Sequence, residues 1–193
     1  SSKFTIVATM GYAYCFVDDI SVEEYNEENK KIEPDKKLFL YLVDRSSSMK
    51  KEDKFTRLKS GLKKSLKKLP SDSYYSIMTF ANNPQTLLPQ TKSLLYDLAS
   101  AIDTVKVNGQ TDAVKAINYA YDFIRANPEY KVELIMCTDG QFSLDDSTYK
   151  KVLEAKMHFN LMQLGGIRNA YLEKLMNATG GKYIVAQNKN VKE

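Results

Sequence analysis

The chain has 193 residues, of which 43% are hydrophobic and 27% charged, and it carries a formal net charge of +4. A chain of this length typically forms one complete domain, and none of its apolar runs approaches the roughly 18 residues needed to cross a membrane. The positive charge is mild and lacks the aromatic or glycine-rich interleaving of nucleic-acid-binding surfaces, so we expect no nucleic-acid partner. An initiator Met and a signal-peptide pattern are both absent, which indicates a processed or excised piece of a longer protein.

The N-terminal segment differs in composition from the rest of the chain. Apolar residues alternate on both sides of Gly11, which is the pattern of a β-hairpin, and the acidic stretch that follows contains Pro34 and few apolar side chains. We therefore predict a hairpin and a solvated linker over residues 1–36 and a folded domain over residues 37–193. The stretch "GYAYCFVDDISV" is also similar to the closing strands of β-sandwich domains in bacterial surface proteins, which would make residues 1–36 the tail of a preceding domain.

From residue 38 onward, apolar strands alternate with amphipathic helices. The continuous apolar run 38–43 is typical of a strand that is covered on both faces. Residues 54–69 place Phe55, Leu58 and Leu62 at three- and four-residue spacing, which predicts a helix with one buried stripe. The same patterns predict further strands over 74–80, 85–91, 132–138, 158–165 and 182–187, and further helices over 92–105, 112–126, 146–156 and 168–178.

This alternation predicts an α/β fold of the Rossmann-like, doubly wound type. We expect a mainly parallel six-stranded sheet with helices on both faces, and the N-terminal β-hairpin as a short extension. The strand 85–91 should lie at an edge, because Pro89 lacks the backbone N–H that a central strand needs. In sheets of this type ligands bind at the carboxyl ends of the strands, where the strand order reverses. Functional residues are therefore expected at those ends.

Three loops carry carboxylate or hydroxyl side chains at or near these strand ends. The residues are Asp44, Ser46 and Ser48 in "DRSSSM", Thr111 in "NGQTD" and Asp139 in "CTDGQ". Hard divalent cations such as Mg²⁺ prefer about six oxygen ligands, some of them supplied by water or a bound partner. His158 is the only histidine and lies within a predicted strand, so no nitrogen cluster competes for a metal. The five side chains are candidate ligands of a divalent cation, Mg²⁺ foremost, with Mn²⁺ or Ca²⁺ as alternatives.

Helix capping is the alternative role for these side chains. Ser and Asp between a strand and a helix often accept hydrogen bonds from free backbone N–H groups. For the serine cluster alone both interpretations are open, and the recurrence of oxygen side chains at Thr111 and Asp139 favours metal binding. Asp112 is expected to cap the helix 112–126 and is left out of the ligand set.

The residues and their order resemble the von Willebrand factor A family, whose metal-ion-dependent adhesion site is built from D-x-S-x-S, a Thr in a glycine-bearing loop and an Asp in T-D-G. The resemblance covers residues 38–187 and includes Gly180 and Gly181 before the last predicted strand. It implies hydroxyl ligands from Ser46, Ser48 and Thr111, and ligation by Asp44 and Asp139 either directly or through water. It also implies that the metal accepts an acidic group of a protein partner as its last ligand.

Two positions depart from the commonest pattern of that family. Ser47 and Gln110 stand where glycine is frequent, and non-glycine residues restrict both left-handed backbone conformations and close backbone approach. All five ligand positions are retained.

The resemblance predicts a binding module rather than an enzyme. The sequence contains no nucleophile elbow, no phosphate-binding loop, and no Cys or Ser with a plausible His partner. We expect a cation-dependent adhesion or assembly domain of a larger bacterial protein that is exported, at the cell surface or extracellular. The alternative is a cytoplasmic adaptor of the same family that regulates an ATPase or the assembly of a complex.

Overall fold

The computed structural model describes residues 8–10, 13–15, 36–91, 95–165 and 168–184. The chain divides into two compact units, residues 1–32 and 33–193, and each is described by itself. In the first unit, β1 (Ala8–Met10) pairs antiparallel with β2 (Ala13–Cys15), which confirms the predicted hairpin. Most of the predicted linker lies outside the described residues, so its interpretation as the tail of a preceding domain stays a prediction.

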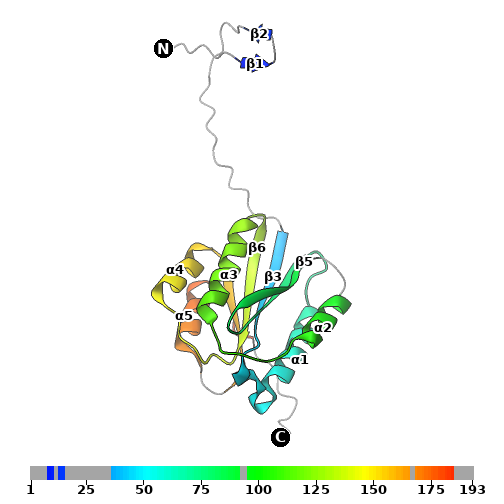
Figure 1. The fold of residues 1–193 in the computed structure, drawn as a ribbon, viewed down its shortest axis with the longest axis vertical. Helices are drawn as coiled ribbons and strands as arrows, with labels where there is room; N and C mark the ends of the chain where they lie inside the picture. The colour runs from blue at the N-terminus through cyan, green and yellow to red at the C-terminus, as the bar shows by residue number, and fades with distance from the viewer. Residues whose placement is uncertain (1–7, 11–12, 16–35, 92–94, 166–167, 185–193) are drawn as a thin grey trace. The chain divides into compact units, whose positions relative to one another are not determined.

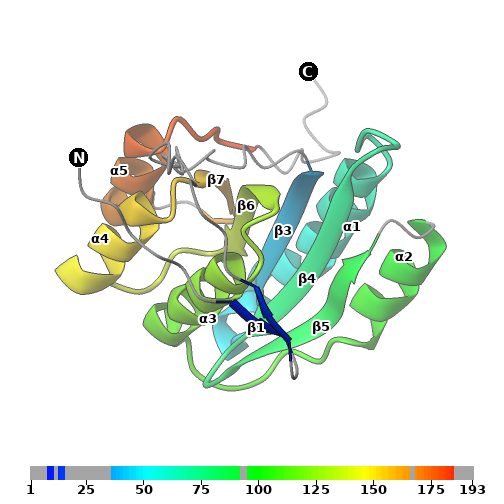
Figure 2. The ribbon, with the colours of Figure 1, turned by 90° about the horizontal axis from the view of Figure 1, so that it is seen from above.

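The second unit is built on a five-stranded sheet (Figure 1), whose strands lie in the order β5-β4-β3-β6-β7 (Figure 2). Its strands are β3 (Lys36–Asp44), β4 (Tyr74–Phe80), β5 (Pro84–Thr91), β6 (Tyr130–Thr138) and β7 (His158–Gln163). β3 pairs parallel with both β4 and β6, and β6 pairs parallel with β7, whereas β5 is antiparallel to β4. Along the chain, β4 and β5 are added on one side of β3, and β6 and β7 are then added on the other side. The strand order therefore reverses between β3 and β6. The predicted doubly wound sheet is confirmed.

Helices cover both faces of this sheet (Figure 2). They are the short 3-10 segment η1 (Ser47–Asp53), α1 (Lys54–Leu66), α2 (Leu95–Thr104), α3 (Ala113–Ala126), α4 (Asp146–Glu154) and α5 (Ala170–Ala178). Buried side chains of α1 and α2 pack on one face, and those of α3, α4 and α5 pack on the other. In the part of the chain that the structure describes, no helix is long and apolar enough to span a membrane.

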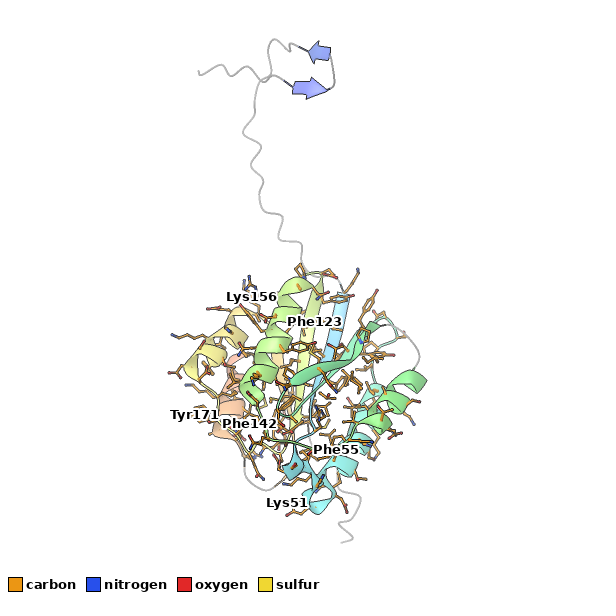
Figure 3. All side chains as sticks on the ribbon, in the orientation of Figure 1. Lys51, Phe55, Phe123, Phe142, Lys156 and Tyr171 are labelled. Carbon is orange, nitrogen blue, oxygen red and sulfur yellow. The ribbon has the colours of Figure 1, made fainter. Side chains whose placement is uncertain are left out.

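The core lies in two layers because successive side chains of a strand point to opposite faces. In β3, Leu40 and Leu42 pack toward the side of α3, and Tyr41 and Val43 pack toward the side of α1. Figure 3 shows side chains filling both layers, with Phe55 of α1 and Phe123 of α3 among them. Burying one such leucine contributes about 1.5–3 kcal/mol, so the two layers hold the ends of the central strands firmly.

Two features at the margins of the sheet bear on the predictions. β5 is an edge strand, as predicted. The register of its pairing with β4 shifts twice, between Tyr75 and Ile77 and between Ile77 and Met78. The predicted sixth strand is represented only by a parallel bridge between Leu161 and Tyr183, and residues 185–187 lie outside the described ones. The described sheet therefore has five strands rather than six.

Candidate metal centre

The carboxyl ends of β3 and β6 bring two acidic residues together at the reversal of strand order. Asp44 is the last residue of β3, and Asp139 directly follows the last residue of β6. Both are buried, with 0% and 4% of their surface exposed. The hydroxyl of Thr138 donates to Asp44 Oδ2 at 2.7 Å, which ties the two strand ends to each other.

The "DRSSSM" loop turns its oxygens toward one another. The backbone N–H of Ser46 donates to Asp44 Oδ1 at 2.8 Å, and the hydroxyl oxygens of Ser46 and Ser48 lie 3.0 Å apart. Ser46 immediately precedes η1, but its side chain makes no capping hydrogen bond with that helix. The capping alternative for Ser46 is therefore wrong, and its hydroxyl belongs to the cluster of oxygens around Asp44.

The loop that carries Thr111 is bound to the "DRSSSM" loop through backbone atoms. Ser47 N donates to Gly109 O at 2.9 Å, and Asn108 N donates to Arg45 O at 2.8 Å. Gly109 has a φ of +90°, and a Cβ added there would lie 2.2 Å from Asn82 Oδ1. Glycine is therefore required at this position.

The two departures from the family pattern do not strain the backbone. Positive φ among the described non-glycine residues occurs at Glu52, Asp53 and Lys156, and so not at Ser47 or Gln110. Both of these side chains are exposed, and they occupy ordinary backbone conformations in which a Cβ is tolerated.

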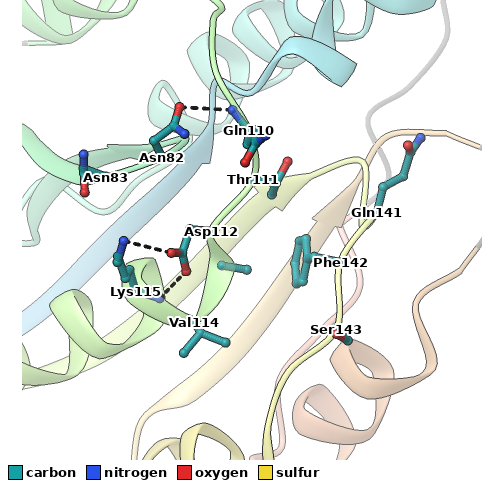
Figure 4. A pocket seen from close by; sticks show the side chains of 11 residues that line it. Asn82, Asn83, Gln110, Thr111, Asp112, Val114, Lys115, Gln141, Phe142 and Ser143 are labelled. Carbon is teal, nitrogen blue, oxygen red and sulfur yellow. Dashed lines mark hydrogen bonds and ion pairs between the residues drawn. The ribbon is translucent and has the colours of Figure 1, made fainter.

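Thr111 is half-buried and lines a cavity of about 510 Å³, together with Gln141 and Phe142 of the loop after β6 (Figure 4). Much of the lining is polar, and it includes the amide side chains of Asn82, Asn83, Gln110 and Gln141. Asn82 accepts a hydrogen bond from Gln110 N at 3.1 Å, which fixes one wall. The next residue, Asp112, accepts from Lys115 N at 2.9 Å as the N-cap of α3, so the predicted capping role of Asp112 is confirmed.

We expect Asp112→Ala to lower the free energy of unfolding by about 1 kcal/mol, the usual cost of losing an N-cap. Asp112→Asn keeps a capping oxygen and should cost much less, although it loses the ion pair between Asp112 and Lys115, whose atoms lie 3.2 Å apart. Urea unfolding of the two variants measures the difference. Equal losses in both would assign the effect to the ion pair.

The loop after β6 is held by side chains from β7 and α5. Asn169 Nδ2 donates to Gly140 O and to Phe142 O, both at 2.8 Å, while its Oδ1 caps α5. Gln163 of β7 extends its amide toward Asp139 O at 3.5 Å. Asp139 itself accepts a hydrogen bond from Lys54 Nζ at 3.2 Å through Oδ2, and from Gln141 N at 3.4 Å through Oδ1. Its carboxylate is thus fixed from several directions.

The buried charges of the described residues lie together in this site. The charged residues buried in the described part of the chain are three, namely Asp44, Lys54 and Asp139, and all three lie here. Burial raises the pKa of Asp44 above its ordinary value, hydrogen bonds from Ser46 and Thr138 oppose that rise, and the nearby charge of Asp139 adds to it. A cation placed among these groups would favour the ionised form of Asp44.

The donor set fits a hard divalent cation. In the residues that the structure describes, no group of three or more His, Cys, Asp or Glu side chains is placed to hold a metal. A cation here would therefore rely on two carboxylates and on the hydroxyl oxygens of the neighbouring loops, which suits a metal that keeps several water ligands. The one buried ammonium leaves this buried cluster with one net negative charge.

Sequence patterns did not single out Lys54, Thr138, Gln163 or Asn169. A signal for Lys54 exists, because it lies four residues before Leu58 and therefore on the buried stripe of α1. The role of Thr138 depends on the pairing of β3 with β6, which brings its hydroxyl to Asp44, 94 residues away in the chain.

Comparison with known proteins gives a consistent family match. Residues 39–141, more than half of the chain, match the model of the von Willebrand factor type A domain. The uncharacterized protein YfbK of Escherichia coli strain K12 is 24% identical over an alignment 159 residues long, which covers 75% of this chain and 27% of YfbK. This chain thus spans about a quarter of that relative.

Two solved structures share the fold at low sequence identity. An aerotolerance-related membrane protein from Bacteroides fragilis NCTC 9343 superposes with a TM-score of 0.66 at 15% identity, over 79% of this chain and 92% of that one. Proximal thread matrix protein 1 from the mussel byssus, described as having a zinc-occupied MIDAS motif, superposes with a TM-score of 0.64 at 18% identity, over 78% of this chain and 43% of that one.

Proposed function

Because this chain belongs to the von Willebrand factor type A domain family, we propose that residues 37–193 form a protein-binding module that depends on a divalent cation. Domains of this family are typically interaction modules without enzymatic activity. The observation that carries the proposal is that hydrogen bonds join the loop after Asp44 to the loop before Thr111 and tie Asp44 to Thr138, the residue before the second buried carboxylate, Asp139.

Five side chains would hold the cation. They are Asp44, Ser46, Ser48, Thr111 and Asp139. We assign Mg²⁺ in preference to softer metals because every donor is a hard oxygen and two carboxylates suffice for a metal that keeps some of its water. When bound, the cation supplies positive charge that attracts an anionic group. The loops supply rigidity, since Asp44, Ser46 and Ser48 are already fixed by hydrogen bonds to one another and to Thr138.

The partner that fits this site is a protein presenting an Asp or Glu side chain. Of the five proposed ligands, Thr111 lines the cavity, and Figure 4 shows Gln141 and Phe142 across it from Gln110. The amide groups that line it can donate hydrogen bonds to the carboxylate or to the backbone beside it. Phe142 adds an apolar surface for the stem of the acidic side chain.

Titration of Mg²⁺ and Mn²⁺ by calorimetry tests the metal site. We expect the Ser46→Ala, Ser48→Ala double variant to bind either metal at least about tenfold more weakly than wild type, because two hard ligands are lost. Ser60 and Ser71 are exposed, so a Ser60→Ala, Ser71→Ala double variant is a matched control and should bind like wild type. Equal affinities for all three proteins would refute the metal assignment.

The acidic-ligand part is tested with acetate as a minimal carboxylate. In saturating Mg²⁺, acetate should shift the amide NMR signals of residues 109–112 and 139–141, and excess EDTA should abolish these shifts. Shifts that persist in EDTA, or that appear only on the lysine-rich face of α1, would place anion binding away from this site.

We further propose that the module works outside the cytoplasm, as part of a larger exported or cell-surface protein. The membrane protein from Bacteroides fragilis supports this placement, as does the similarity of residues 11–22 to strands of surface proteins. Recovery of the protein from the cytoplasmic fraction of its native cells would instead favour the adaptor role, in which the module regulates an ATPase or complex assembly.

A further inference from the structure

Lys54 is a buried cation inside the candidate metal centre. Its side chain is 6% exposed, that of Asp139 is 0% exposed, and Lys54 Nζ lies 3.2 Å from Asp139 Oδ2. The end of the side chain passes Gly165 after β7, where an added Cβ would lie 3.5 Å from Lys54 Cε and 3.6 Å from Nζ. Lysine rarely forgoes hydration to this extent unless it is paired.

The backbone before α1 is bent in a way that directs this lysine inward. Glu52 and Asp53 have φ values of 53° and 52°, two consecutive non-glycine residues in the left-handed region. Such conformations cost free energy and persist where the surrounding structure holds them. α1 begins directly after them, so Lys54 joins the buried stripe of Phe55, Leu58 and Leu62 instead of extending into water.

We propose that Lys54 is a resident counter-cation that balances the site when no metal is bound and weakens metal binding by its charge. This inference rests on the proposed function. Without Lys54, the buried carboxylates of Asp44 and Asp139 would carry two uncompensated negative charges. With Lys54, the metal-free cluster keeps one net negative charge, and the same cluster holding a divalent cation has one net positive charge.

The surplus positive charge has a direct consequence for ligand choice. The cluster has one net positive charge when it holds the cation. A single carboxylate neutralises that charge. Lys54 therefore lowers the affinity for the metal and raises the affinity of the loaded site for an acidic partner, since like charges repel and opposite charges attract at short range in a poorly solvated setting. A purely structural lysine that only orients Asp139 would have the opposite effect on the metal.

Removal of this charge is the test, with Mg²⁺ alone as the first probe and the full 193-residue chain as the protein. We expect Lys54→Met to bind Mg²⁺ about tenfold or more tightly than wild type in calorimetry, and to melt at a lower temperature than wild type in EDTA. Lys54→Gln removes the charge but keeps an amide donor, and it gives the same readout should Lys54→Met fail to fold. Lys64→Met, an exposed lysine of the same helix, should match wild type in both measurements.

The results separate this inference from the function on which it rests. Unchanged or weaker Mg²⁺ binding in both Lys54 variants, with binding retained in wild type, would overturn the role of Lys54 alone. Absence of Mg²⁺ binding in wild type and in every variant would overturn the metal site and this inference with it. Tighter Mg²⁺ binding together with weaker acetate binding to the loaded Lys54→Gln protein would support both parts of the proposal.

Discussion

Asp44→Asn is expected to abolish the response to Mg²⁺ and, at the same time, to stabilise the metal-free protein at neutral pH. The loss of a buried negative charge should weaken Mg²⁺ binding by about 100-fold or more. The gain in stability follows from the burial of Asp44, which raises the pKa of its carboxyl and so makes the ionised form costly in the fold. Asn retains an oxygen that can accept from Ser46 N, and its amide can donate to the Thr138 hydroxyl.

The effect of Asp44 on the stability of the metal-free protein depends on pH. A carboxyl group with a raised pKa binds protons more tightly in the folded state than in the unfolded state. The metal-free wild type therefore loses stability as the pH rises from the ordinary pKa of Asp to the raised value, and the loss persists at neutral pH. Thermal melts in EDTA should show Asp44→Asn to be more stable at pH 7, with the advantage disappearing below the ordinary pKa. A less stable Asn variant at pH 7 would mean that the hydrogen bonds of the carboxylate outweigh its desolvation.

Gly181→Ala is expected to cause the largest loss of folding stability among single-methyl additions. A Cβ at position 181 would lie 1.9 Å from the carbonyl oxygen of Phe159 and 2.6 Å from its carbon, and both belong to the backbone of β7. Because backbone atoms cannot move aside cheaply, the segment 182–184 would have to separate from β7 and lose the two hydrogen bonds that Leu161 makes with Lys182 and Ile184. A cost of about 3 kcal/mol lowers the melting temperature by roughly 6–12 °C.

The neighbouring glycine offers a matched control for this prediction. Gly180 has a φ of +69° after the end of α5, and an added Cβ there meets no atom within 4 Å. Asn tolerates this left-handed conformation, so Gly180→Asn should change the melting temperature little. Melting curves for the two single variants measure the difference. Equal decreases in melting temperature would contradict the role of the clash between position 181 and the backbone of Phe159.

The fold was predictable because its periodic segments are long and regular. The continuous apolar run of β3 and the apolar stripe of α1 are both local patterns, and each predicted its element. The sixth strand was less predictable, because residues 182–184 join the sheet at one bridge directly after the Gly180–Gly181 turn. A short apolar run after a turn does not reveal how many residues will pair.

The candidate site was predictable where its chemistry lies in short sequence motifs, and not where it depends on geometry. Asp44 and Asp139 could be identified because each follows a strongly apolar strand. Lys54 was harder to identify, although its spacing from Leu58 places it on the buried stripe of α1. A lysine at a helix start normally lies in water, and this one follows two left-handed residues that local preferences disfavour. The amide of Asn169 is similar, since its contacts with Gly140 and Phe142 join parts of the chain 29 and 27 residues apart.

The irregular β5 strand has a consequence for how this module avoids unwanted association. An edge strand with free backbone groups is a template for pairing with another chain, and regular edges of this kind promote aggregation. Pro84 and Pro89 each lack a donor N–H, and the two register shifts interrupt the ladder against β4. β5 therefore resists the addition of a foreign strand along its outer side.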